Sequence, residues 1–169
     1  NQTGIKDYIS TISTACSSSA NAILLGARLV KNGLLDRVLA GGVDALTLFT
    51  LNGFNSLMIL DRSGCKPFDE ERNGLTLGEG AGFLMIESEG SVKKQGKTIL
   101  GEIKGYGNAC DAFHQTASSP EGNGAYLSME KALATTGLKP AMIDYINAHG
   151  TGTKNNDLSE GIAIKRLFQ

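Results

Sequence analysis

A cysteine in this sequence has the surroundings of a nucleophile. Cys16 lies in the segment TACSSS, between small hydroxyl residues and directly before a run with helical spacing. Unpaired backbone N–H groups at a helix N-terminus carry partial positive charge, which favours a thiolate over a thiol. The same N–H groups can stabilise an oxyanion that forms beside the sulfur. We interpret Cys16 as a candidate nucleophile for acyl transfer, and the alternative is an inert buried cysteine.

A histidine far along the chain offers the matching proton chemistry. His149 lies in NAHGTGT, where Gly150 and Gly152 let the backbone turn tightly beside a ligand. Thr151 and Thr153 place two hydroxyl groups on the same loop. An imidazole in this position can donate a hydrogen bond or move a proton near neutral pH. The small polar neighbours argue against a histidine that is buried in the core.

Other candidate sites are weaker. His114 lies in a loop before a predicted helix, and we expect it to be exposed or to make a structural hydrogen bond. Two histidines and three dispersed cysteines, the others being Cys65 and Cys110, have no metal-ligand spacing, so we expect neither a metal nor a bound cofactor. The glycines of GEGAG (78–82) lead into a strand rather than a helix, which excludes a dinucleotide fingerprint. We expect them to allow close backbone packing beneath a site.

Strand-like and helix-like segments alternate along the chain. Patterns typical of strands lie at residues 7–14, 37–46, 97–109 and 142–150, and the glycine-rich stretch 75–88 runs into a further strand. Helices are predicted from Ala20 to a stop at Gly33, over 50–60, and from Pro120 to Gly137. This alternation favours an α/β architecture with a parallel or mixed sheet.

The last predicted helix begins with an acidic pair. Asp157 and Glu160 have D-x-x-E spacing, so we expect Asp157 to cap the N-terminus while Glu160 reaches back, as in a capping box.

Composition narrows the class of protein. A chain of 169 residues with 41% hydrophobic and 20% charged residues is typical of one soluble globular domain. Its net charge of -1 gives no support for a nucleic-acid or membrane partner, and no apolar run approaches a membrane span. An odd number of dispersed cysteines and the lack of a targeting segment favour the cytoplasm. Because the chain starts without methionine and ends within a helical pattern, we expect an excerpt of a longer protein.

Four motifs in register resemble one enzyme family. TACSSS, PFDEERNGLTLGEGAG, DAFHQTASSPEG and NAHGTGTKNND together resemble the β-ketoacyl-acyl carrier protein synthases, the condensing enzymes of the thiolase superfamily. The resemblance covers essentially the whole chain, and LTLFTLNGFNSLMILD is closer to the synthases of bacterial aryl polyene clusters. It implies an α/β fold with a thiolase-like mixed sheet layered with helices. Residues 1–169 would be the central part, with the first half-domain ending about residue 90 and the second starting about residue 91.

The resemblance also implies an activity and its residues. The protein would be a 3-oxoacyl-[acyl-carrier-protein] synthase of fatty acid, polyketide or aryl polyene biosynthesis, acting by decarboxylative Claisen condensation. Cys16 would carry the acyl chain as a thioester, and His149 would bind the malonyl thioester carbonyl and assist its decarboxylation. Thr151 and Thr153, with Thr116 as a weaker candidate, would hydrogen-bond the phosphopantetheine arm delivered on the carrier protein. Phe54 would lie near the acyl pocket.

Parts of the family pattern have no counterpart here. These are the second active-site histidine in a GHxxGAAG-type motif, the C-terminal glycine-rich segment and the N-terminal half-domain. We therefore predict an incomplete fold that is poorly active or inactive alone.

The resemblance further implies partners. We expect an acidic acyl carrier protein, and a homodimer or a heterodimer formed through strand 7–14. Basic contacts could come from Lys6, Arg28, Lys31, Arg37, Lys93, Lys94 and Lys97.

Two alternatives stay open at this point. A papain-like hydrolase also joins a cysteine to a remote histidine, but the aromatic residue that follows the papain cysteine is missing here. A non-catalytic partner subunit similar to a chain-length factor is the second, and the presence of Cys16 argues against it.

Overall fold

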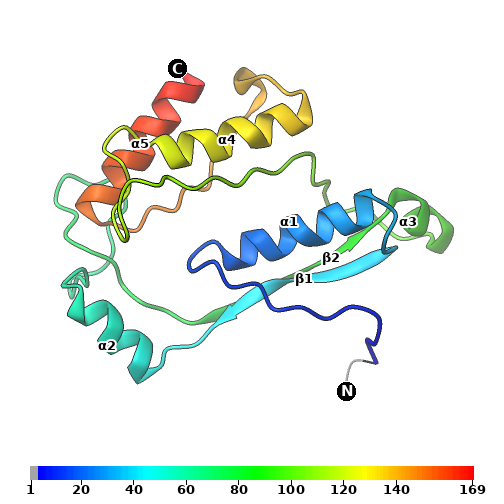
Figure 1. Ribbon diagram of the computed structural model, residues 1–169, viewed down its shortest axis with the longest axis horizontal. Coiled ribbons are helices and arrows are strands. Elements are labelled where there is room, and N and C mark those ends of the chain that lie inside the picture. Colours follow the sequence, from blue (N-terminus) through cyan, green and yellow to red (C-terminus); the bar gives the residue numbers. More distant parts are fainter. Residues whose placement is uncertain (1–3) are drawn as a thin grey trace. The chain divides into compact units, whose positions relative to one another are not determined.

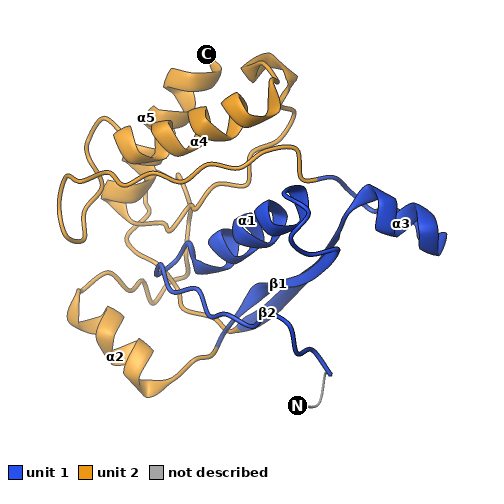
Figure 2. Ribbon diagram, turned by 45° about the vertical axis from the view of Figure 1, so that its right-hand side comes forward, with its two compact units in different colours: residues 1–44, 80–102 blue, residues 45–79, 103–169 orange. Residues whose placement is uncertain are grey.

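The computed structural model describes residues 4–169, which form two compact units (Figures 1 and 2). Unit 1 comprises the residues up to 44 and residues 80–102, and unit 2 comprises residues 45–79 and 103–169. The chain thus leaves unit 1 once and returns to it before the second unit is completed. The half-domain boundary expected near residue 90 stays a prediction.

Unit 1 is a helix packed on a two-stranded sheet. The helix α1 (Ser18–Lys31) lies against β1 (Arg37–Asp44) and β2 (Gly80–Glu87), which pair antiparallel, and α3 (Glu89–Gln95) follows β2. Helix and sheet approach closely because α1 carries Gly26 at the contact. A Cβ there would lie 3.1 Å from Ile86 Cδ1 and 3.2 Å from Val38 Cγ1.

The paired glycines of β1, Gly41 and Gly42, lie where other atoms approach the backbone closely. A Cβ on Gly41 would overlap the carbonyl oxygen of Gly82, and one on Gly42 would overlap the Ser19 hydroxyl. The close packing predicted for the GEGAG glycines is wrong, because a Cβ would meet nothing within 4 Å at Gly78, Gly80 or Gly82. In this sheet close packing therefore requires glycine in β1, at Gly41 and Gly42, and not in β2.

Unit 2 is built from helices and long irregular segments. Its elements are α2 (Leu48–Ser56), α4 (Asn123–Thr136), the 3-10 turn η1 (Pro140–Met142) and α5 (Lys154–Phe168). Helices α4 and α5 pack together around the buried Ala163. Gly137 ends α4 in a left-handed conformation, as the sequence predicted, and α2 agrees with the helix expected over 50–60.

Three predicted strands are wrong in the described chain. Residues 7–14, 97–109 and 142–150 join no sheet, and residues 7–14 contribute only an isolated bridge between Thr14 and Cys16. A strand needs a neighbour that takes its backbone hydrogen bonds, and the described sheet contains β1 and β2 alone, antiparallel rather than parallel or mixed. Within 97–109 a helix side chain replaces that neighbour, because Tyr106 N donates to Thr135 Oγ1 of α4 at 3.0 Å.

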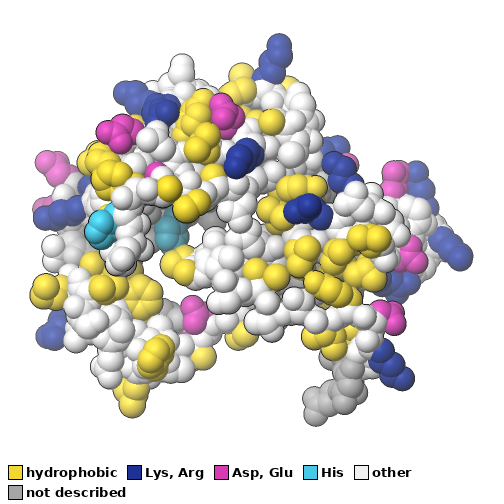
Figure 3. All heavy atoms as spheres, viewed as in Figure 1, with side chains coloured by type: hydrophobic (Ala, Val, Ile, Leu, Met, Phe, Trp, Pro, Cys, Tyr) yellow, Lys and Arg dark blue, Asp and Glu magenta, His cyan; other side chains and the backbone are white. Residues whose placement is uncertain are grey.

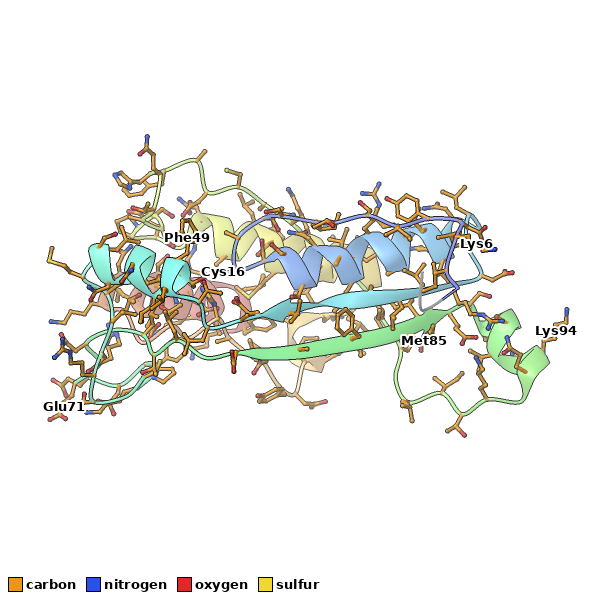
Figure 4. All side chains as sticks on the ribbon, turned by 90° about the horizontal axis from the view of Figure 1, so that it is seen from below. Lys6, Cys16, Phe49, Glu71, Met85 and Lys94 are labelled. Atoms are coloured by element: carbon orange, nitrogen blue, oxygen red, sulfur yellow. The ribbon has the colours of Figure 1, made fainter. Side chains whose placement is uncertain are left out.

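Much apolar surface lies exposed, as the yellow spheres of Figure 3 show. The described hydrophobic core consists of three alanines, Ala27, Ala40 and Ala163. Alternation places Leu39, Val43, Phe83 and Met85 on the sheet face opposite α1, where they are 49–73% exposed (Met85 is labelled in Figure 4). Exposed apolar patches of this kind are typical of surfaces that pack against further protein. None of the helices within residues 4–169 has the length and apolar character needed to cross a bilayer.

Candidate active site

Cys16 lies exposed in a sharp turn at the N-terminal end of α1 (Figure 4). The residue before it, Ala15, has a φ of +53°, a left-handed conformation that costs a non-glycine residue roughly 1–2 kcal/mol. Ser17 is the N-cap and α1 begins at Ser18, so the positive end of the helix dipole lies next to the sulfur. The first turn of α1 contains no acidic residue that would oppose a negative charge there.

Hydroxyl groups hold this turn together. Ser18 Oγ donates to the carbonyl oxygen of Ala15 at 2.7 Å and accepts from Thr14 N at 2.8 Å. Ser17 Oγ donates to the Thr14 carbonyl at 2.8 Å, and Asn21 Nδ2 donates to Thr14 Oγ1 at 2.8 Å. The small hydroxyl residues around Cys16 therefore fix its backbone, a role that the sequence alone had not shown.

His149 is exposed, and carboxylate side chains of α5 accept hydrogen bonds from the backbone of its loop. Its backbone N–H donates to Glu160 Oε1 at 2.7 Å, and Gly150 N donates to Glu160 Oε2 at 2.9 Å. Gly152 N donates to Asp157 Oδ1 at 3.2 Å. Two acidic side chains of α5 thus bind three amide groups of one short loop.

The predicted capping box is therefore wrong. The N-cap of α5 is Thr153, and the helix begins at Lys154, so Asp157 already lies inside its first turn. A capping box needs its first residue outside the helix. Asp157 and Glu160 instead direct their carboxylates to the loop that precedes the helix.

Residues 65–74 support the same loop from another side. Gly152 is buried with a φ of +73°, and a Cβ there would lie 2.6 Å from Gly74 O and 2.9 Å from Cys65 Sγ. Gly74 N donates to Gly152 O at 3.0 Å, and Cys65 Sγ donates to Thr151 O at 3.2 Å. The PFDEERNG segment and the GTGT segment, far apart in sequence, form one structural cluster.

The predicted substrate-binding residues differ in their surroundings. Thr151 and Thr153 are half-buried, and their hydroxyl oxygens lie 2.8 Å apart. Thr116 is exposed, and its backbone N–H donates to Nδ1 of the exposed His114 at 3.2 Å, which is the structural hydrogen bond expected for that histidine. Phe54 is half-buried in α2.

Unit 2 brings His149, Thr151 and Thr153 onto one loop, while Cys16 belongs to unit 1. The cooperation of Cys16 with His149 therefore stays a prediction, as do the roles of Thr116 and Phe54. Sequence reasoning missed the contacts of Cys65, Asp157 and Glu160 with the loop. The D-x-x-E spacing of Asp157 and Glu160 was visible in the sequence. This spacing alone does not tell whether the carboxylates bind amides at the helix N-terminus or amides of a neighbouring loop.

Two family profiles match the chain in succession. One is "Beta-ketoacyl synthase, N-terminal domain", over residues 2–91, and the other is "Beta-ketoacyl synthase, C-terminal domain", over residues 100–169. The first alone covers more than half of the sequence. The chain belongs to the β-ketoacyl synthase family.

Individual β-ketoacyl synthases agree with this assignment. The chain is 42% identical over 162 residues to 3-oxoacyl-[acyl-carrier-protein] synthase 2 of Synechocystis sp., covering 92% of this chain and 39% of that protein. It matches the ketosynthase ApeO, solved with its chain length factor ApeC from Xenorhabdus doucetiae, with a TM-score of 0.84 and 42% identity over 94% of this chain and 38% of that chain.

A further structure contains a type II PKS acyl-carrier protein in complex with its ketosynthase bound to the hexaketide. Its match has a TM-score of 0.91 and 31% identity, covering 95% of this chain and 41% of that chain.

These matches settle the coarse expectations from the sequence. The expected family of acyltransferases and its thiolase-like α/β fold are confirmed, the fold being incomplete relative to the family, and the papain-like alternative is wrong. The chain spans about two fifths of the length of the curated β-ketoacyl synthases that it matches.

Proposed function

We propose that the protein containing this chain is a 3-oxoacyl-[acyl-carrier-protein] synthase that uses Cys16 as its nucleophile. The observation that carries this proposal is the exposed thiol in a turn fixed by hydroxyl groups at the start of α1. An accessible sulfur held beside a helix N-terminus suits covalent acyl transfer. A non-catalytic subunit similar to a chain-length factor would have no use for it.

The proposed reaction has two stages. The Cys16 thiolate attacks the thioester carbonyl of an acyl carrier protein and forms a new carbon–sulfur bond. The bond between that carbonyl and the phosphopantetheine sulfur breaks, and phosphopantetheine leaves as its thiolate. Malonyl-carrier protein then loses carbon dioxide, and its enolate attacks the acyl-cysteine carbonyl. This step forms the carbon–carbon bond and releases the thiolate of Cys16. Covalent capture divides a difficult condensation into two steps.

The other candidate residues serve the second substrate. His149 donates a hydrogen bond to the malonyl thioester carbonyl, where negative charge develops as the enolate forms. The hydroxyls of Thr151 and Thr153, together with Thr116, bind the phosphopantetheine arm, and Phe54 contacts the acyl chain. The adjacent hydroxyls of Thr151 and Thr153 support this role, because a close pair can both donate to and accept from an amide-containing arm.

Partners follow from the same proposal. The protein binds an acidic acyl carrier protein in the cytoplasm, with scattered lysines and arginines as contacts, and it assembles as a homodimer or heterodimer through residues 7–14. Residues 7–13 join no sheet in the described chain, and all of them except Ile12 are exposed, which supports an interface role. The relatives solved with a carrier protein or a chain length factor are further support.

Mass spectrometry tests the function directly. The polypeptide produced from the complete gene is incubated with an acyl-carrier protein, and we expect an acyl adduct on Cys16 that Cys16→Ala abolishes. Cys65→Ala is the matched control and should keep the adduct. Residues 1–169 alone should give little condensation. Absence of the adduct in the wild-type protein would contradict the proposal and favour a partner subunit. An adduct that persists in Cys16→Ala would contradict the proposal too, because another residue would then be the one acylated.

A further inference from the structure

The backbone of His149 is tied to a side chain of the following helix. Glu160 lies half-buried in α5, and its two carboxylate oxygens accept from consecutive amides, those of His149 at 2.7 Å and Gly150 at 2.9 Å. Hydrogen bonds to an ionised carboxylate are roughly twice as strong as neutral ones. Both acceptors belong to one rigid group, so together they orient the two peptide planes on either side of the His149 Cα, Ala148–His149 and His149–Gly150.

Asp157 binds a third amide of the same loop, that of Gly152. Its side chain is 1% exposed, and it accepts from Gly152 N at 3.2 Å. Glu160 and Asp157 lie three residues apart, on the same side of α5. The amides of the loop therefore point toward the carboxylates of α5, while His149 itself is exposed.

The loop needs such support because of its composition. Gly150 and Gly152 both have positive φ, at +53° and +73°, and glycine gives a free loop many alternative conformations. An unsupported His149 would sample many positions. Groups that act on a reacting atom must be held within a fraction of an ångström, and a displacement of 1 Å can reduce a rate about a hundredfold.

We propose that Glu160 is a positioning residue, which sets the direction of the His149 side chain by binding the two amides at the base of its loop. This role rests on the proposed function, because it matters for catalysis only if His149 acts on the malonyl thioester. Glu160 itself contacts no substrate. Its effect should fall on the condensation stage and spare the acylation of Cys16.

Hydrogen exchange tests the structural part. In Glu160→Gln one carboxylate oxygen becomes an NH₂ group, which cannot accept from a backbone amide. In the polypeptide produced from the complete gene, we expect peptides covering residues 147–153 to exchange about tenfold faster, while peptides from α4 stay unchanged. The matched control is Glu130→Gln, which removes an exposed carboxylate bound to Tyr126 Oη at 3.0 Å. Wild-type exchange of residues 147–153 in Glu160→Gln would overturn the proposal.

Kinetics test the catalytic part. We expect Glu160→Gln to lower kcat for condensation at least about tenfold, with KM for malonyl-carrier protein and the rate of Cys16 acylation each within about twofold. An equal loss of acylation and condensation, together with a lowered Tm, would show a merely structural role and overturn the proposal. Unchanged condensation would overturn it as well.

A second variant covers the case in which Glu160→Gln does not fold. Glu160→Asp keeps the charge on a shorter side chain, and we expect the same selective loss of condensation, by about threefold or more. If the wild-type protein never acylates Cys16, the proposed function fails. The hydrogen-exchange experiment does not depend on acylation of Cys16, so failure of the proposed function and failure of the role proposed for Glu160 can be told apart.

Discussion

The backbone N–H of Phe68 donates a 2.7 Å hydrogen bond to Asp157 Oδ2, across 89 positions of the sequence. Phe68 has a φ of +62°, which is uncommon for a bulky residue and is maintained only where the surroundings hold it. The same carboxylate accepts from Gly152 N and has Arg72 Nε at 3.8 Å. Asp157 thus joins the PFDEERNG segment, the GTGT loop and α5.

Replacing Asp157 should therefore destabilise unit 2 strongly. Asp157→Ala leaves the amides of Phe68 and Gly152 without their acceptor and removes the carboxylate that forms an ion pair with Arg72. Because Asp157 is buried, we expect a loss of about 3 kcal/mol in the free energy of unfolding. Urea unfolding of the complete gene product measures this value. Asp144→Ala, at an exposed position, is the matched control and should change stability by less than about 0.5 kcal/mol. Equal values for the two variants would contradict the assignment.

The turn around Cys16 depends on a different chemistry, that of hydroxyl groups. Ser18→Ala removes the donor to Ala15 O and the acceptor of Thr14 N, so we expect Cys16 acylation to slow by about three- to tenfold. Stopped-flow acylation measures the rate. Ser128→Ala is the control, because its hydroxyl also donates to a carbonyl three residues earlier, that of Ala125 at 2.9 Å, but lies inside α4. If both variants acylate at the wild-type rate, the network does not position the sulfur.

Local sequence patterns predicted α1, α2, α4 and α5, missed the short helix α3, and predicted the strands poorly. Gly137 ends α4 because glycine adopts a left-handed conformation without cost, and this information lies within the segment. A strand depends on a neighbour, and 7–14, 97–109 and 142–150 have none in the described chain. Their alternation is compatible with a sheet, but only tertiary structure supplies the pairing partner.

The candidate site shows the same difference between features that a local sequence motif reveals and contacts that only the folded chain reveals. Cys16 and His149 could be recognised from residue type and neighbours, because TACSSS and NAHGTGT are local motifs. The contacts of Glu160 with the His149 loop and of Cys65 with Thr151 could not, since they join segments through space. The acidic pair shows why spacing misleads: D-x-x-E fits a capping box, yet both carboxylates point to the preceding loop.

Acid should weaken the start of α4 through Asp111. Its carboxylate accepts from Ser119 N at 2.6 Å and from Gly124 N at 3.2 Å, and these hydrogen bonds, the one from Ser119 first, hold the pKa of Asp111 below its usual range. A carboxyl with a lowered pKa in the folded state adds stability above its unfolded pKa of roughly 4 and loses it as the pH falls through the folded value.

We therefore expect Asp111→Asn to be less stable than the wild type at neutral pH, with the difference narrowing below about pH 4. Thermal unfolding across this pH range measures the effect. Asp144→Asn, at an exposed position, should run parallel to the wild type. A stability difference for Asp111→Asn that is independent of pH would rule out a contribution from its ionisation.

The β1–β2 pair offers a steric test of the fold. A Cβ on Gly41 would overlap the Gly82 carbonyl oxygen and lie 2.7 Å from Phe83 Cα, so Gly41→Ala must displace one strand. Backbone atoms cannot rotate away as a side chain can, and we expect a loss of about 2 kcal/mol in unfolding free energy. Gly82→Ala is the matched control on the facing strand, since its Cβ meets nothing within 4 Å, and it should be neutral or slightly stabilising. Guanidinium unfolding of both variants decides: if Gly41→Ala is no worse than Gly82→Ala, the strands do not approach as closely as described.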